Sequence, residues 1–178
     1  MRRMRYVLIL LAWLSICPAT YGNRQDMTSG KSRDLRIYSL PPFERAIRCI
    51  MHYEGWHGSP KHLPYVGYGH RLQPHERLTC QLTRAQGDSL LRADMRRLCR
   101  MFRRFGRDSV LLACLSYQVG PYRLLGSRRL PKSRLISKLE RGDRDIYKEY
   151  VSFRKWKGRI IPSIERRRRV EFALLFEP

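Results

Sequence analysis

Apolar and polar residues recur along much of this chain at the spacing of amphipathic helices. The first such segment begins near residue 43, and its apolar positions fall three and four residues apart. They are Phe43, Ala46, Ile47, Ile50 and Met51. Residues at that spacing share one face of a helix, so the pattern predicts a helix packed against a core. Gly55 follows and predicts the end of this helix.

Two further helices are predicted in the middle of the chain. The sequence Thr-Arg-Ala-Gln that begins at Thr83 has the form of a capping box, and Gly106 ends the apolar stripe that follows it. That stripe consists of Leu91, Met95, Leu98, Phe102 and Phe105. Asp108 is a suitable N-cap for residues 109–118, which carry apolar residues on almost every side. A helix of that kind belongs in the centre of a core.

Shorter helices are predicted toward the C-terminus, over residues 133–139, 143–153 and 162–176. The sequence Val-Gly-Tyr-Gly from Val66 has the alternation of a short hairpin strand, with glycines where backbones approach closely. Together these patterns predict a mostly α fold of the α+β class, with one small hairpin near its start. The charged run 165–169 is interpreted as a solvated helix face, with contact to an anionic ligand as the alternative.

Glu54 occupies the apolar face of the first predicted helix, at its last position. A carboxyl that leaves a core face beside aromatic residues is partly removed from water. Desolvation disfavours the charged form of a carboxyl, as a general acid that works near neutral pH requires. Glu54 is therefore a candidate catalytic acid, with a solvated helix-terminal glutamate as the alternative.

The first 22 residues have the features of a secretory signal peptide. A basic stretch at Arg2, Arg3 and Arg5 precedes an apolar segment over residues 6–16, and small residues follow where cleavage would fall. The apolar segment is shorter than the roughly 20 residues that a transmembrane helix needs. Lipid attachment at Cys17 is an alternative. We therefore expect export to the periplasm or the extracellular space, with no transmembrane segment.

The remaining chain suits a flexible polar leader over residues 23–40 and one domain over residues 41–178. The formal net charge of the full chain is +22, which predicts a polyanionic partner. Nucleic acid, an anionic membrane surface and the acidic bacterial cell wall all meet that description. Export argues against nucleic acid, and no aromatic signature of an RNA-binding sheet is present.

Four cysteines follow the signal segment: Cys49, Cys80, Cys99 and Cys114. In an oxidising compartment they could form two disulfides by three connectivities, between which the sequence does not choose. Buried free thiols are the favoured interpretation, because a domain of this size does not need disulfides to be stable. The sequence contains no phosphate loop, dinucleotide fingerprint or nucleophile elbow, so no cofactor is expected.

The linker after Glu54 carries no second carboxylate before Glu76, although glycoside hydrolysis usually uses two. It offers Ser59 and four histidines instead: His57, His62, His70 and His75. A neutral imidazole can accept a proton from water near pH 7, so a histidine could supply the base. The alternatives are polar hairpin residues without a catalytic role, and a zinc site, which the spacing of the histidines does not favour.

Four blocks of sequence resemble motifs of a known family, in the same order. Glu54-Gly55 with the segment 65–70 is similar to a helix ending in Glu-Gly and a hairpin reading Thr-Ile-Gly-Tyr-Gly-His. Residues 117–120 resemble Phe-Asn-x-Gly, and residues 133–143 resemble Ser-x-Leu-x-x-Lys-Leu-x-x-Gly-Asp. Residues 164–171 resemble Leu-x-x-Arg-Arg-x-x-Glu. From residue 42 to its end, the chain thus resembles the phage-type lysozymes, glycoside hydrolase family 24.

The resemblance implies a lysozyme-like fold in which a small hairpin lobe faces a helical lobe across a cleft. It implies a muramidase that hydrolyses the bond between N-acetylmuramic acid and N-acetylglucosamine in peptidoglycan, with Glu54 as general acid and without cofactor or metal. By analogy with family positions, the residues expected to contact the glycan are Tyr65, Tyr68, Gly69, His70 and Gln118. Such proteins also resemble lysozymes encoded beside conjugation machinery, so conjugation or secretion machinery is a further expected partner of a monomeric enzyme.

The chain departs from the family at the second catalytic carboxylate. Its hairpin is a few residues shorter, Tyr65 falls on the position of the family's threonine, and no aspartate lies between Glu54 and Glu76. The catalytic roles of the family's aspartate and threonine therefore cannot be assigned to any residue of this chain, and His62 or His57 is the candidate base. Two other functions stay open: a lytic transglycosylase, which needs one acid/base group, and an inactive peptidoglycan-binding module. Membrane disruption by the basic surface is a third.

Overall fold

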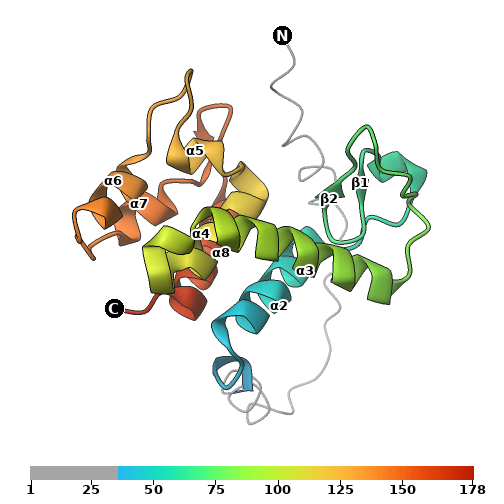
Figure 1. Ribbon diagram of the computed structural model, residues 1–178, viewed down its shortest axis with the longest axis horizontal. Coiled ribbons are helices and arrows are strands. Elements are labelled where there is room, and N and C mark those ends of the chain that lie inside the picture. The colour runs from blue at the N-terminus through green and yellow to red at the C-terminus, as the bar shows by residue number, and fades with distance from the viewer. Residues whose placement is uncertain (1–35) are drawn as a thin grey trace. The chain divides into compact units, whose positions relative to one another are not determined.

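The structure is a computed structural model and describes residues 36–178 (Figure 1). The expected signal peptide over residues 1–22 and most of the expected leader lie outside the described residues. The chain divides into two units, Met1–Leu40 and Pro41–Pro178. In the first unit, residues 36–38 form a helical turn, and the backbone N–H of Leu40 donates to the carbonyl of Ile37. Within residues 36–178, no helix combines the length and apolar character needed to cross a membrane.

The second unit is mostly helical, as predicted, with two small antiparallel hairpins. Its α-helices are α2 (Pro42–Glu54), α3 (Arg84–Met101), α4 (Ser109–Val119), α5 (Tyr122–Leu125), α6 (Arg134–Glu140), α7 (Tyr147–Val151) and α8 (Pro162–Leu175). Its strands are β1 (Tyr65–Val66), β2 (His70–Arg71), β3 (Lys155–Trp156) and β4 (Arg159–Ile160). Two 3₁₀ segments, Pro60–His62 and Arg103–Asp108, connect these elements.

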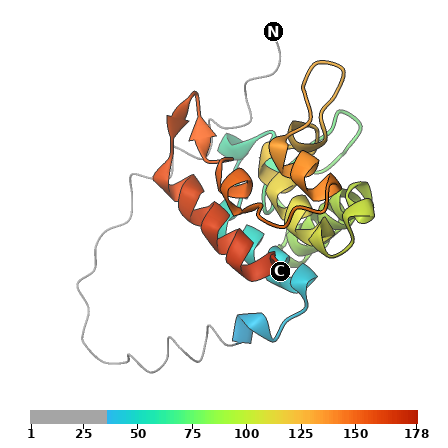
Figure 2. The ribbon, with the colours of Figure 1, turned by 90° about the vertical axis from the view of Figure 1, so that its left-hand side faces the viewer.

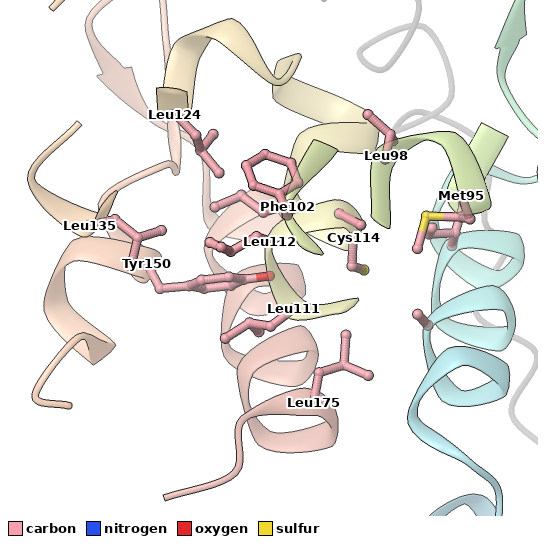
Figure 3. Close-up of a cluster of buried hydrophobic side chains, with 14 of the residues drawn as sticks. Met95, Leu98, Phe102, Leu111, Leu112, Cys114, Leu124, Leu135, Tyr150 and Leu175 are labelled. Carbon is pink, nitrogen blue, oxygen red and sulfur yellow. The ribbon is translucent and has the colours of Figure 1, made fainter. Parts of the chain in front are cut away.

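The helix α4 lies at the centre of the core, as its apolar sequence predicts. It packs against α2, α3 and α8, and Figure 3 shows its residues Leu111, Leu112 and Cys114 among side chains from the surrounding elements. All residues from Leu111 to Leu115 are fully buried. Because the surrounding helices cover every side of α4, it can carry apolar residues all round.

The predicted ends and faces of α2 and α3 are confirmed. Ala46, Ile47 and Ile50 are fully buried, and Gly55 follows the last residue of α2 with a positive φ of 66°. Thr83 and Gln86 form both hydrogen bonds of the capping box at the start of α3. The local patterns therefore place these two helices correctly, and with them the end of α2 that carries Glu54.

The structure differs from the local predictions at three points. Asp108 occupies the N-cap position of α4 as predicted, but its side chain makes no capping hydrogen bond and instead forms an ion pair with Arg144. The helix expected over residues 143–153 is only Tyr147–Val151. The hairpin β3–β4 was not foreseen, because its turn contains Lys157 at a φ of 47° where asparagine or glycine is the usual signal. Figure 2 shows this hairpin leading into α8.

All four described cysteines are free thiols, of which Cys49 and Cys114 are buried. Cys49 belongs to α2 and Cys114 to α4, and these two helices pack together. A hydrogen bond with Cys49 and burial both raise the pKa of the Cys114 thiol well above its usual value. The Cys114 thiol therefore stays protonated, and both buried cysteines pack as small apolar side chains.

Candidate active site

Glu54 is the last residue of α2, and its side chain is 12% exposed. The guanidinium of Arg167, from α8, donates a hydrogen bond from Nη1 to Glu54 Oε1 at 2.5 Å. Arg167 itself is 2% exposed. The end of α2 and the middle of α8 therefore meet at a buried arginine that leaves part of the Glu54 carboxyl open to solvent.

The hairpin β1–β2 lies directly over the second oxygen of this carboxyl. At Gly69 the backbone has a φ of +89°, and a Cβ atom there would lie 3.3 Å from Glu54 Oε2. A side chain at this position would therefore crowd the carboxyl as well as strain the backbone. Glycine at position 69 lets the hairpin backbone approach Glu54 without covering it.

Trp56 seats the hairpin on the first turns of α3. Its ring contacts Tyr68 edge-on at 5.1 Å, and the guanidinium of Arg84 lies 4.3 Å from the centre of the ring. A Cβ atom at Gly87 would lie 2.5 Å from the ring, so only glycine lets α3 approach Trp56 this closely. Figure 1 shows the hairpin beside the N-terminal half of α3. Trp56 was not among the residues predicted from the sequence to have a role.

His70 joins the hairpin to α3 through two carboxylates. Its Nδ1 lies 2.5 Å from Asp94 Oδ2, and its Nε2 lies 3.0 Å from Glu76 Oε2. Burial disfavours the charged ring, but the hydrogen bonds and charges of Asp94 and Glu76 outweigh it and raise the pKa of His70. Both ring nitrogens are therefore used within the protein, which gives His70 a structural role. Its expected contact with glycan stays a prediction.

His57 and His62 lie together at the base of the hairpin. The centres of their rings are 5.1 Å apart, and His57 exchanges backbone hydrogen bonds of 2.7 and 3.1 Å with Gly67. His57 is 9% exposed, and its Nδ1 has no hydrogen-bond partner among residues 36–178. Burial lowers the pKa of His57, the charge of Glu54 opposes this change, and the nearby His62 adds to it. His57 is thus a neutral imidazole within the electrostatic reach of Glu54.

The other expected glycan contacts lie on the hairpin and at the end of α4. Tyr65 and Tyr68 are partly exposed, and the carbonyl of Tyr68 accepts a hydrogen bond of 2.9 Å from the hydroxyl of Tyr117. Gln118 is partly exposed, and its Oε1 is buried without a hydrogen-bond partner among the described residues. The amide oxygen of Gln118 is therefore available to accept a hydrogen bond.

The charged run on α8 is not simply a solvated face, and that prediction was wrong for two of its residues. Arg167 and Arg168 are 2% and 0% exposed, while Arg166 and Arg169 are exposed. The buried pair binds Glu171, which is itself fully buried. The sequence signal for this cluster was the family-like spacing Arg-Arg-x-x-Glu, and the charge pattern alone pointed the other way.

The described histidines do not gather into a metal site. His70 is held by Asp94 and Glu76, whereas His57 and His62 pair with each other. Within residues 36–178, no group of three or more histidine, cysteine, aspartate or glutamate side chains is placed to hold a metal ion. The carboxylates Asp94, Glu76 and Glu171 are all engaged by protein donors.

A carboxyl at the end of a helix, beneath a small hairpin and beside a helical lobe built on one buried helix, defines a lysozyme-like protein. The model of the phage lysozyme family matches residues 51–171, and the chain belongs to that family. Membership implies a glycosidase of the lysozyme type with peptidoglycan as its substrate. No curated protein matches the chain.

Proposed function

We propose that this protein is an exported muramidase that cleaves the bond between N-acetylmuramic acid and N-acetylglucosamine, with Glu54 as general acid. The observation that carries the proposal is the placement of Glu54, whose carboxyl is held by Arg167 on one oxygen and lies under Gly69 at the other. A carboxyl that is held in place and remains partly exposed can deliver a proton to the leaving oxygen of a bound glycan.

The base is proposed to come from the histidine pair. His62 is partly exposed and can contact water, while His57 lies behind it with a lowered pKa. A neutral imidazole can take the proton of an attacking water, which is the role of the second carboxylate in other glycosidases. If His62 fills this role, His62→Ala should lower the rate of cleavage by about 100-fold or more. His57→Ala should then lower the rate much less, and the opposite order would identify His57 as the base.

The glycan is proposed to lie against the hairpin and the end of α4, in contact with Tyr65, Tyr68, Gly69, His70 and Gln118. Tyr68 and Gln118 are the first to test, because the partly exposed ring of Tyr68 can stack on a sugar and the amide oxygen of Gln118 has no hydrogen-bond donor among the described residues. The positive charge would hold the enzyme on the anionic wall and raise its encounter rate, an effect that salt weakens. Conjugation or secretion machinery is proposed as the setting in which a monomeric enzyme opens the wall locally.

A lytic transglycosylase is the second candidate function, and the missing second carboxylate favours it. In that reaction a hydroxyl of the sugar itself attacks the anomeric carbon, so one acid/base group suffices. Mass spectrometry of the products separates the two: reducing ends indicate hydrolysis, and anhydro-muramyl ends indicate transglycosylation.

The test of the catalytic role is the clearing of cell walls by Glu54→Gln. The amide keeps the size of the side chain but cannot donate a proton as an acid, so clearing should fall by at least about 100-fold. Glu44→Gln is the matched control, because Glu44 also lies on α2 and forms its ion pair with Arg92, away from Arg167. Equal clearing by wild type and Glu54→Gln would refute the enzyme proposal. A wild-type protein that binds walls but never clears them would indicate an inactive binding module.

A further inference from the structure

A buried cluster of four side chains stands behind Glu54. At its centre, Glu171 accepts hydrogen bonds from Arg167 Nε at 2.7 Å, from the hydroxyl of Tyr150 at 3.0 Å, and from Arg168 Nη1. All four side chains are 2% exposed or less. Arg167 then reaches Glu54 through its Nη1, so one guanidinium connects the two carboxylates.

The charges of this cluster balance only when Glu171 is counted. Arg167 and Arg168 bring two positive charges, while Glu54 and Glu171 bring two negative ones when both are ionised. The Nε and Nη2 atoms of Arg168 have no hydrogen-bond partner among the described residues, so Glu171 is the carboxylate that offsets its charge. Charges interact strongly at such buried positions, because little water screens them.

We propose that Glu171 is a positioning residue that sets the pH range in which Glu54 can donate its proton. It binds Arg167 at Nε, while Glu54 binds the same guanidinium at Nη1, and so it fixes the guanidinium against the catalytic carboxyl. Its negative charge also offsets the arginines, which would otherwise favour the ionised form of Glu54. The inference rests on the proposed role of Glu54 as general acid and concerns the control of that role.

The other groups that face Glu54 change little across the working pH range. Tyr117 from α4 has a pKa raised by burial, and Tyr53 from α2 itself has a pKa raised for the same reason, so both stay uncharged. His57, from the loop after α2, has a lowered pKa and stays neutral near pH 7. The hairpin contributes Gly69, which has no charge. Among these groups, the charge in direct contact with Glu54 is that of Arg167 on α8.

The test is the pH dependence of glycan cleavage by variants of the cluster, measured on purified peptidoglycan. Cleavage by a general acid is lost on the basic side of the profile, where the acid becomes ionised. Glu171→Gln removes a negative charge, so this limb should move to lower pH by about one unit. Arg168→Gln removes a positive charge and should move the limb to higher pH. A structural role of the cluster would lower stability in both variants without shifting their limbs in opposite directions.

The double variant Arg168→Gln with Glu171→Gln keeps the cluster balanced, so its basic limb should return to that of the wild type. Glu165→Gln is the matched control on α8, because Glu165 pairs with Arg154 and Arg169 outside the cluster and its substitution should leave the limb unchanged. If Glu171→Gln does not fold, Arg168→Gln and the double variant still decide the question. Unshifted limbs in the folded variants would overturn the proposal.

These outcomes are separate from the test of the proposed function. If Glu54→Gln clears walls as well as the wild type, Glu54 is not the acid and the proposed function fails. If Glu54→Gln is inactive but the α8 variants keep the wild-type profile, the proposed function stands and only the role of Glu171 is refuted.

Discussion

His70 and Arg167 are two buried basic side chains of the site, and each binds two carboxylates. His70 bridges Asp94 and Glu76 and so ties the hairpin to α3. Arg167 bridges Glu54 and Glu171 and so ties the end of α2 to α8. The difference is that a histidine loses its proton in the physiological pH range and an arginine does not. Arg167 therefore keeps its charge across the physiological pH range, whereas the attachment of the hairpin depends on the protonation of His70.

The largest effect is expected from loss of the arginine. Arg167→Met keeps a long side chain but leaves the buried carboxylates with fewer donors, so the free energy of unfolding should fall by about 3–5 kcal/mol. Chemical denaturation measures this change. Arg169→Met, on the exposed face of the same helix, is the control and should change stability far less. Equal effects of the two substitutions would show that the buried bridge does not hold α2 to α8.

A smaller effect is expected on the hairpin side. Asp94→Asn removes the carboxylate nearest to His70 Nδ1 and should lower the free energy of unfolding by about 2 kcal/mol near pH 6. Because Asp94 also pairs with the exposed Arg97, Arg97→Gln is the control that isolates the histidine contact. A loss in Asp94→Asn no greater than that in Arg97→Gln would refute the role given to His70.

The pH dependence of stability sharpens the same comparison. The pKa of His70 is raised in the folded protein, so its contribution is fully present below the unfolded value of about 6.5. It is lost as the pH rises through the higher folded pKa. The stability of the wild type should therefore decline on the alkaline side, and the decline should be weaker in Asp94→Asn. Parallel curves for the two proteins would contradict this account.

The smallest effect is expected at the start of α3, on which the hairpin rests. Thr83→Ala removes the hydroxyl that accepts the backbone N–H of Gln86, so it should cost about 1 kcal/mol. Thermal unfolding gives the size of the loss. Gln81→Ala, just before the helix, should have a smaller effect, and the reverse order would show that the capping box contributes little.

The sequence predicts well what depends on neighbouring residues. The apolar face that ends at Glu54 and the capping box at Thr83 are local patterns, and both appear as expected. The buried state of Arg167 and Arg168 was not predictable from charge, because it depends on partners distant in sequence. Glu54 precedes Arg167 by 113 residues, and the wrong assignment of a solvated face followed from reading α8 alone.

The hairpin lobe shows the same limit. The sequence located the hairpin and its glycines, but Tyr68 and Gly69 form the turn and not the predicted strand. The link from His70 to Asp94 crosses 24 residues and an intervening loop. The role of Trp56 was not predicted, because its partner Gly87 is a glycine inside a helix. Such a glycine indicates close packing only when the positions of both elements are known. The family-like motifs located Glu54 and the pair Arg167 and Arg168, and the structure supplies the contacts between them.

The most direct test of the central claim is the release of new reducing ends from purified peptidoglycan by wild type, Glu54→Gln and Glu44→Gln at equal concentration. This measurement reports broken glycosidic bonds, so disruption of membranes by a basic protein cannot mimic it. The account predicts release by wild type and Glu44→Gln, with a loss of at least about 100-fold in Glu54→Gln. Equal release by wild type and a folded Glu54→Gln would contradict it.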